Sequence, residues 1–378
     1  MENSYRTIII QFHNKIFIIC KILNFFFEGN SKVLTMDILI DFRKLLLTGK
    51  KSGVRNVIQY IEKNLINAEY SKFIVTEILH VSTIRPFFTE FLAEIIIEAS
   101  KIPYLLTLKT DLLNYVEYIH GPLIRMLYDK KYYFLDDLHV LFSSKKELKA
   151  FFAPELHLTS EDFQLIPQLQ CLSGSFSELE NNEWEMFKEM INLGYVQNTI
   201  GFAMKYDDPS LISEFILNDF DIKGNTGPSL HETLGGFDMT LINAAALYAS
   251  PNCFKELIMN GVELKEETCE YAVLGGDKEI INTCLKKFPK SKKFIPAAIK
   301  GNQNNILIEL VNNGFSVSTN IYFIIEAHNY FALDYLLNKK LVDPDSRSIQ
   351  MSNKLAEQNN NFELFGVLKK LTSLPKLK

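Results

Sequence analysis

The chain has 378 residues, enough for two or three domains, and with 47% hydrophobic and 22% charged residues it can bury a sizeable core. Its net charge of −5 provides no global basic footprint, so we expect no nucleic-acid partner. The five cysteines form no Cys-x-x-Cys and no metal-ligand spacing. We interpret them as reduced, small hydrophobic residues, which predicts a cytoplasmic location.

The first 35 residues form an apolar N-terminal segment. Within residues 5–28, polar residues recur along about one stripe of a helix. Lys15 and Lys21 interrupt any apolar run long enough to span a bilayer. Four interpretations of 1–35 remain open: a buried or docked helix, an untranslated extension before a true start at Met36, a membrane-lying helix, and a signal or anchor.

Residues 36–170 show apolar residues at helical spacing, punctuated by prolines that begin new helices or lie in linkers. We predict six to eight short helices forming a helical N-terminal domain. The sequence from Ser144 to Glu147 predicts a capping box at the start of one of them. Residues 171–180 are small and polar enough for a domain boundary, and we expect Trp184, just beyond it, to pack toward this domain.

A pattern recurs in residues 181–378, which we predict to be a repeat domain. Ala245, Ala272 and Ala298 each begin a unit, 27 and then 26 residues apart, and apolar pairs follow each of them at the same two distances. A fixed period of this kind is typical of stacked repeat proteins. The predicted fold class is therefore all-α, with a C-terminal solenoid of short helix-turn-helix repeats.

The turn between the two helices of each unit has its own residue preference. Four residues after the first position of each unit the chain has Asp207, Ala249, Gly276, Asn302, His328 and Asn360. All but the alanine tolerate positive φ well, as the end of a reversing helix requires. The following residues, Asp208, Ser250, Asp277, Gln303, Asn329 and Asn361, are mostly good helix N-caps. Each unit is therefore predicted to be helix, left-handed turn, cap and helix.

These residues resemble ankyrin repeats. Thr240–Ala246 is similar to the ankyrin segment T-P-L-H-x-A-A, with Leu for Pro and Asn for His, and Gly261–Glu263 is similar to its G-A-D ending. The periods of 26 and 27 residues are shorter than is usual for ankyrin repeats. The sequences CFKELIMNG at 253–261 and EETCEYAVLGGDKEII at 266–281 are similar to a divergent ankyrin family expanded in parasitic protists, whose C-terminal domain has no defined function. The resemblance implies protein–protein binding, with a scaffold role, through a concave groove lined by the first helices.

The predicted groove row lies two and three residues after the start of each unit. Its partner-binding candidates are Lys205, Tyr206, Leu247, Tyr248 and Lys300. The loop inserted at 221–236 leaves the stack beside this row, and it is either functional or disordered. Ordinary partial burial of the two tyrosines is the alternative to an interface role.

The sequence contains no recognisable catalytic motif, no histidine pair with ligand spacing and no phosphate-binding glycine loop. We therefore expect no enzyme, no cofactor and no metal site. Five lysines within 286–293 are interpreted as a solvated helix end or as an anionic-lipid or nuclear-import patch. The leading prediction is a protein-binding module with a partner of unknown identity. The alternative is a peripheral membrane protein recruited by residues 5–28 or by these lysines.

Overall fold

The computed structural model describes residues 36–342, apart from 52, 67, 69, 115–119, 167–168, 170–171, 228, 232–238, 318 and 320. The apolar segment 1–35 and the turn residue Asn360 lie outside the described residues. The part of the chain that is described is all-α, as predicted. Its β structure is limited, within those ranges, to one isolated antiparallel bridge between Asn225 and Thr240.

The chain divides into two compact units, each assembled from segments that are distant in sequence. Unit 1 comprises residues 1–80, 94–115 and 317–378, and unit 2 comprises 81–93 and 116–316. This division differs from the predicted domains 36–170 and 181–378. The predicted boundary at 171–180 lies inside unit 2, whereas helices from both ends of the described chain belong to unit 1.

Unit 1 is a group of helices from both ends of the described chain. It contains α2 (Met36–Thr48), α3 (Gly53–Asn64), most of α4 (Tyr70–Ile84), the end of α5 (Thr89–Ala99), α6 (Leu108–Asn114), α20 (Ile321–Glu326) and α21 (Tyr330–Asn338). Helix α2 packs against α3 and α21. Phe42 and Leu46, four residues apart on α2, are fully buried, as an amphipathic helix requires. The Phe42 ring lies 5.5 Å from the ring of Phe73 on α4.

The first half of unit 2 is joined to the repeats through α11. It contains α7 (Gly121–Asp129), α8 (Leu135–Ser144), α9 (Ser160–Leu165) and α11 (Phe176–Leu193). Helix α11 packs against α7. The Trp184 ring on α11 lies 6.1 Å from Phe163 on α9 and 5.6 Å from Phe187. The predicted packing of Trp184 toward the preceding helices is confirmed, and these aromatic contacts explain why 171–180 is no boundary between the units.

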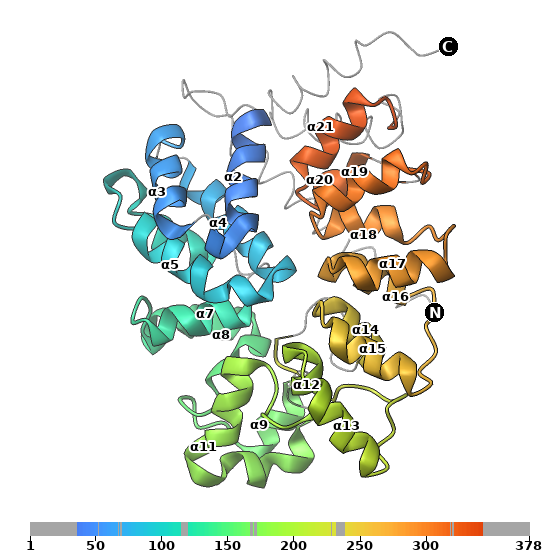
Figure 1. The fold of residues 1–378 in the computed structure, drawn as a ribbon. Helices are drawn as coiled ribbons and strands as arrows, with labels where there is room; N and C mark the ends of the chain where they lie inside the picture. Colours follow the sequence, from blue (N-terminus) through green and yellow to red (C-terminus); the bar gives the residue numbers. More distant parts are fainter. Residues whose placement is uncertain are drawn as a thin grey trace, which may run out of the picture. The chain divides into compact units, whose positions relative to one another are not determined.

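The second half of unit 2 is a series of four helix hairpins (Figure 1). They are α12 (Ile200–Tyr206) with α13 (Pro209–Leu217), α14 (Leu241–Leu247) with α15 (Pro251–Met259), α16 (Thr268–Gly275) with α17 (Lys278–Lys287), and α18 (Phe294–Lys300) with α19 (Asn304–Asn312). The first helices pack in the order α12, α14, α16 and α18, and the second helices α13, α15 and α17 pack likewise. The alanines that define the repeat, Ala245, Ala272 and Ala298, are fully buried.

Close approach of the hairpins explains one repeat glycine. A Cβ atom added to Gly275 at the end of α16 would lie 2.1 Å from the carbonyl oxygen of Ala246 on α14. Any side chain there would force the two helices apart. The glycine in this row position is therefore a packing requirement and leaves no side chain for a ligand.

The predicted capping box at Ser144 is wrong. Ser144 is the last residue of α8, and its hydroxyl donates hydrogen bonds to the carbonyls of Val140 and Leu141 at 3.0 and 3.1 Å. The residues that follow, Lys146–Phe152, form a 3₁₀ helix that has no side-chain cap. Because serine can bond either to the preceding turn or to the next helix, its sequence position alone did not decide between them.

Candidate functional site

All five described hairpins, including α20–α21 of unit 1, share one turn conformation. The residue between the two helices has φ of 55° at Asp207, 56° at Ala249, 86° at Gly276, 51° at Asn302 and 48° at His328. Positive φ is therefore observed at each predicted turn residue within the described ranges. Ala249, the residue type least suited to the turn, adopts the same angle, so the hairpin geometry sets this conformation.

The cap position serves two purposes. Asp208, Asp277 and Asn329 accept hydrogen bonds from backbone N–H groups of the helices they precede. Ser250 instead donates to the carbonyl of Met204 at 2.6 Å, and Gln303 donates to the carbonyl of Leu274 at 3.1 Å. Ser250 occupies the N-cap position of α15, as predicted, but its side chain does not cap the helix. At these two positions the side chain ties its hairpin to the preceding one.

The predicted groove row is divided into covered and open residues. Lys205 and Tyr248 are both 7% exposed, whereas Tyr206 is 45% exposed. Leu247 is half-buried, and the Lys300 side chain is 41% exposed and pairs with Glu270 at 3.6 Å. Two of the five candidates, Lys205 and Tyr248, therefore face protein. Truncation of the buried Tyr248 would therefore be expected to disturb the fold, whereas the Tyr206 ring is exposed.

The covered part of the row is occupied by the chain's own segment Ile84–Phe88, which includes a 3₁₀ turn and belongs to unit 2. The Phe87 ring meets the Tyr248 ring edge-on at 6.0 Å, and the Lys205 ammonium lies 5.4 Å from the centre of the Phe87 ring. Arg85 donates to the carbonyl of Gly301, in the last row position, at 2.8 Å. We call the row positions that this segment contacts, Lys205, Tyr248 and Gly301, the cis-occupied row.

Lys205 is held in a polar setting inside unit 2. Its ammonium donates to the carbonyl of Leu193 at 2.7 Å and lies 3.1 Å from Nδ1 of His231, while Nε2 of His231 lies 2.7 Å from the carbonyl of Ile191. Burial, and then the charge of Lys205, hold the pKa of His231 well below its ordinary value. Gly194, which ends α11, has φ of 85°, a left-handed conformation that favours glycine at this helix end.

The described part of the inserted loop is ordered against the stack. The Thr226 N–H donates to the carbonyl of Met239 at 2.8 Å, which closes the loop at its base. Thr226, Ser229 and His231 are buried. His231 therefore reaches from the loop to Lys205 at the start of the row. Residues 232–236 of the predicted loop lie outside the described residues.

Unit 1 contains a buried ionic cluster, centred on Glu77 of α4, that includes the turn residue His328. Glu77 pairs with Arg43 of α2 at 2.7 Å, with His328 Nδ1 at 2.9 Å, and accepts from the Tyr330 hydroxyl at 3.2 Å. His80 contacts Arg43 and stacks on His328 at 4.5 Å. The turn residue of the α20–α21 hairpin is thus fixed by the N-terminal helices α2 and α4.

The charges in this cluster are set by burial and by neighbours. Burial alone would raise the pKa of Glu77, but Arg43 and His328 hold the pKa below its ordinary value. Burial, followed by the charges of Arg43 and His328, keeps the pKa of His80 well below its ordinary value. Burial, and then Glu77, raise the pKa of Tyr330. Glu77 is therefore the negative centre that holds α2, α4 and α21 together.

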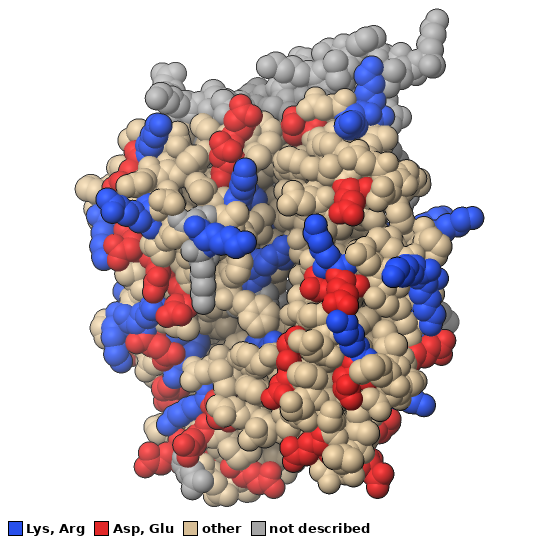
Figure 2. Space-filling view, in the orientation of Figure 1, with Lys and Arg blue, Asp and Glu red and all other residues tan. Residues whose placement is uncertain are grey.

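The lysine cluster lies at one edge of the stack. Lys286, Lys287, Lys290, Lys292 and Lys293 are all exposed, at the end of α17 and in the loop before α18. Lys287 donates to the carbonyl of Leu264 at 2.8 Å, which places the cluster against the preceding interhairpin loop. Basic side chains project near α17 in Figure 2, with acidic side chains beside them.

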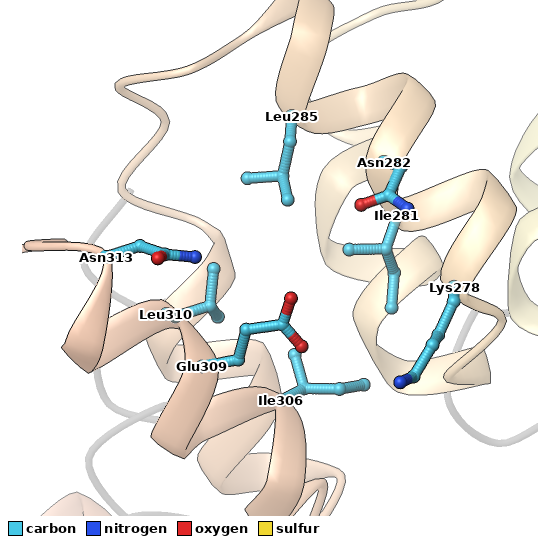
Figure 3. Close-up of a pocket in the computed structure, with 8 residues that line it drawn as sticks. All are labelled: Lys278, Ile281, Asn282, Leu285, Ile306, Glu309, Leu310 and Asn313. Carbon is cyan, nitrogen blue, oxygen red and sulfur yellow. The ribbon is translucent and has the colours of Figure 1, made fainter.

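A small cavity lies between the second helices α17 and α19. Figure 3 shows Ile281 and Leu285 facing Ile306 and Leu310, with the Glu309 carboxylate pointing into the gap. Its volume is about 40 Å³. Pockets for small molecules have volumes of about 300–1,000 Å³. The cavity is therefore too small to hold a metabolite.

The chemistry of the remaining candidate groups is limited in the described part of the chain. No group of three or more His, Cys, Asp or Glu side chains there could hold a metal ion. Cys253, Cys269 and Cys284 are free and buried, and burial raises the pKa of the Cys253 thiol. None of the described helices combines the length and the apolar character needed to cross a bilayer.

Sequence reasoning missed both docking contacts made by the N-terminal helices. Arg85 contacts Gly301 across 216 residues, and His328 contacts Glu77 across 251. A repeat pattern identifies which residues share a row but carries no information about which distant segment covers it. The Arg-Pro-Phe-Phe sequence at 85–88 was a usable signal, because an arginine and two aromatic residues in a short connection are enriched at interfaces.

Comparison with known proteins gives one family match. Residues 259–336 match the model of a family described as a domain of unknown function (DUF3447). The matched range runs from the last residue of α15 into α21 and so contains the hairpin α16–α17, the hairpin α18–α19 and most of α20–α21. Neither the curated proteins nor the solved structures contain a match to the chain.

Proposed function

We propose that this chain is a non-catalytic binding protein with an ankyrin-like solenoid, which engages a protein partner through the open residues of the first-helix row. The observation that supports this most is the division of the row. Lys205 and Tyr248 are covered in cis, whereas Tyr206, Leu247 and Lys300 retain exposed surface. Within the described residues, these three side chains are available to a partner without displacement of the segment Ile84–Phe88.

Tyr206 is the best anchor in this surface. Its ring lies 4.5 Å from the ring of Phe202, one turn earlier on α12, so its position is restricted before a partner arrives. Restricted aromatic side chains with a polar tip provide contact area at low entropic cost and are enriched among interface hot spots. Lys300, paired with Glu270, contributes a polar rim on α18 and α16.

The test uses full-length protein to capture a partner from the source cell, followed by binding measurements with the purified partner. Tyr206→Ala is expected to weaken binding by about 1–2 kcal/mol, roughly tenfold. Phe134→Ala removes another exposed aromatic ring, at the start of α8, and is expected to leave binding unchanged. Equal effects of the two substitutions, or none from Tyr206→Ala, would contradict the proposed surface.

A second candidate function is recruitment to an anionic membrane by the lysine cluster 286–293. The exposure of all five lysines favours it. The other proposed anchor, residues 5–28, lies outside the described residues. Co-sedimentation of the full chain with phosphatidylserine vesicles tests it directly, and unchanged sedimentation of Lys290→Glu plus Lys292→Glu would exclude the lysines as the membrane contact.

A further inference from the structure

Two neighbouring interhairpin loops carry opposite charge. The acidic finger, Glu263–Glu267, joins α15 to α16 and contains three glutamates and one lysine. The basic finger, Lys286–Lys293, covers the end of α17 and the loop to α18, and contains five lysines and no acidic residue. The contact of Lys287 with the carbonyl of Leu264, at 2.8 Å, shows that the two fingers lie side by side.

The chain itself neutralises these charges only in part. Lys293 lies 4.0 Å from Glu270 on α16, at the near edge of the basic finger. Glu267 accepts a hydrogen bond from Asn243 at 3.3 Å. Among the described residues, the structure shows no ion pair for Glu263 and Glu266 of the acidic finger, or for Lys286, Lys290 and Lys292 of the basic finger. All five of these side chains are exposed.

The adjacency of the fingers restricts the chemistry of a partner. A uniformly anionic surface, such as the membrane of the second candidate function, would be attracted by the basic finger but repelled by the acidic finger one hairpin away, so the adjacency favours a partner that carries both signs. A matching partner needs both signs in the opposite order, separated by about the 8–10 Å between packed helices. This chain carries such a pair of fingers itself.

We propose that the two fingers form a self-complementary contact between two copies of this chain. A two-fold axis passing between the fingers places the acidic finger of each copy on the basic finger of the other. Such an isologous contact closes after two copies, because each patch is used once. Complementary charge of this kind steers encounter and fixes register, and it is sensitive to salt. The contact does not involve Tyr206, Leu247 or Lys300, so it is independent of the proposed partner surface.

The experiment is sedimentation velocity of the purified full-length chain over a range of protein concentrations. Association is expected at about 0.02 M salt and its loss at about 0.5 M, where the screening length falls to a few ångströms. Two reversal variants are compared. One carries Lys286→Glu, Lys290→Glu and Lys292→Glu, which makes the net charge of the basic finger negative, and the other carries Glu263→Lys plus Glu266→Lys, which makes that of the acidic finger positive. Each variant alone is expected to self-associate at least about tenfold more weakly, because like charges then face each other.

The decisive sample is an equimolar mixture of the two reversal variants. In the mixture, both finger contacts again join fingers of opposite net charge, so association is expected to be at least about tenfold stronger than that of either variant alone. The charge-matched control for the basic-finger variant is Lys44→Glu with Lys51→Glu and Lys63→Glu, which changes three exposed lysines of unit 1 and is expected to associate like the unmodified chain. A monomer at both salt concentrations, reversal variants that associate normally, or a mixture that stays monomeric would each overturn the proposal. None of these outcomes depends on finding a partner protein.

Discussion

Each unit buries a cationic side chain, and the groups that surround the cation differ between the two units. In unit 1 the guanidinium of Arg43 pairs with the buried carboxylate of Glu77. In unit 2 the ammonium of Lys205 is surrounded by a backbone carbonyl, the ring nitrogen of His231 and the faces of Phe87 and Tyr248. The first arrangement depends on opposite charge, and the second combines neutral acceptors with aromatic faces.

The two sites nevertheless have one feature in common. Each lies at the turn end of a hairpin, beside His328 in unit 1 and beside the Asp207 turn in unit 2. Each is covered by an N-terminal segment, α2 with α4 in unit 1 and Ile84–Phe88 in unit 2. The turn ends of the hairpins are therefore docking surfaces for the chain itself, which limits the surface left for a partner. Where the covering contact is ionic, losing one partner is expected to cost most.

The largest expected effect comes from breaking the ionic cluster. Glu77→Ala leaves Arg43 buried without its carboxylate and removes the acceptor of His328 and Tyr330. Removing one member of a buried ion pair typically costs about 3–5 kcal/mol, and we expect a loss in this range in urea denaturation.

The matched control replaces both charges, as Arg43→Met plus Glu77→Leu. Because no unpaired charge is then buried, much of the lost stability is expected to return. A double variant as unstable as Glu77→Ala would show that hydrogen bonds to His328 and Tyr330, and not the ion pair, hold the cluster together.

Acidification is expected to cause the next largest loss of stability, because the fold buries several histidines in their neutral form. Burial lowers the pKa of His120 at the start of α7 to about 4, and the pKa values of His80 and His231 also lie well below the ordinary value. The fold keeps these rings neutral, whereas the unfolded chain takes up protons below about pH 6.5. The protein therefore keeps its full stability above about pH 6.5. Its free energy of unfolding decreases as the pH falls from about 6.5 toward the lowered pKa values that these histidines have in the folded state.

For His120 alone this loss amounts to about 2 kcal/mol between pH 7.5 and pH 5. Urea denaturation at the two pH values measures it, with His120→Gln as the comparison. The variant is expected to lose about 2 kcal/mol less on acidification than the unmodified chain. Glu77 does not contribute to this difference, because its pKa is lowered in the fold and its protonation affects stability only at pH values below the ordinary pKa of a carboxyl group. Equal acid sensitivity of the two proteins would show that His120 is protonated in the fold.

Substitution of a hairpin turn residue is expected to cause a smaller loss of stability. Gly276 has φ of 86°, and a Cβ there would lie 2.5 Å from the Gln303 amide nitrogen. Gly276→Val is expected to cost about 1–2 kcal/mol, because a β-branched residue is strained in this region. Gly314 has φ of 80° with no atom near its added Cβ, so Gly314→Val isolates the backbone contribution. A thermal melting curve unchanged by Gly276→Val would contradict the turn assignment.

The sequence predicted the hairpins because their information is local. Turn residues such as Asp207 and Asn302 indicate a positive φ, and the repeated alanines indicate close contact between helices. Both signals can be recognised without knowing the rest of the fold. The sequence predicted which residues form the candidate row, but it did not predict that Lys205 and Tyr248 would be buried. Both residues contact Phe87, more than 100 residues earlier, and the local repeat pattern does not identify which distant segment lies against them.

The most direct test of the cis-occupied row compares the reactivity of two lysines in one native protein. Brief acetylation of the full chain, read by peptide mass spectrometry, measures Lys205 and Lys300 together. Because the Lys205 ammonium is buried between His231 and the Phe87 ring, we expect it to react at least about tenfold more slowly than Lys300. Phe87→Ala is expected to raise the rate at Lys205 and leave the rate at Lys300 unchanged. Equal rates for the two lysines in the unmodified chain would contradict the account.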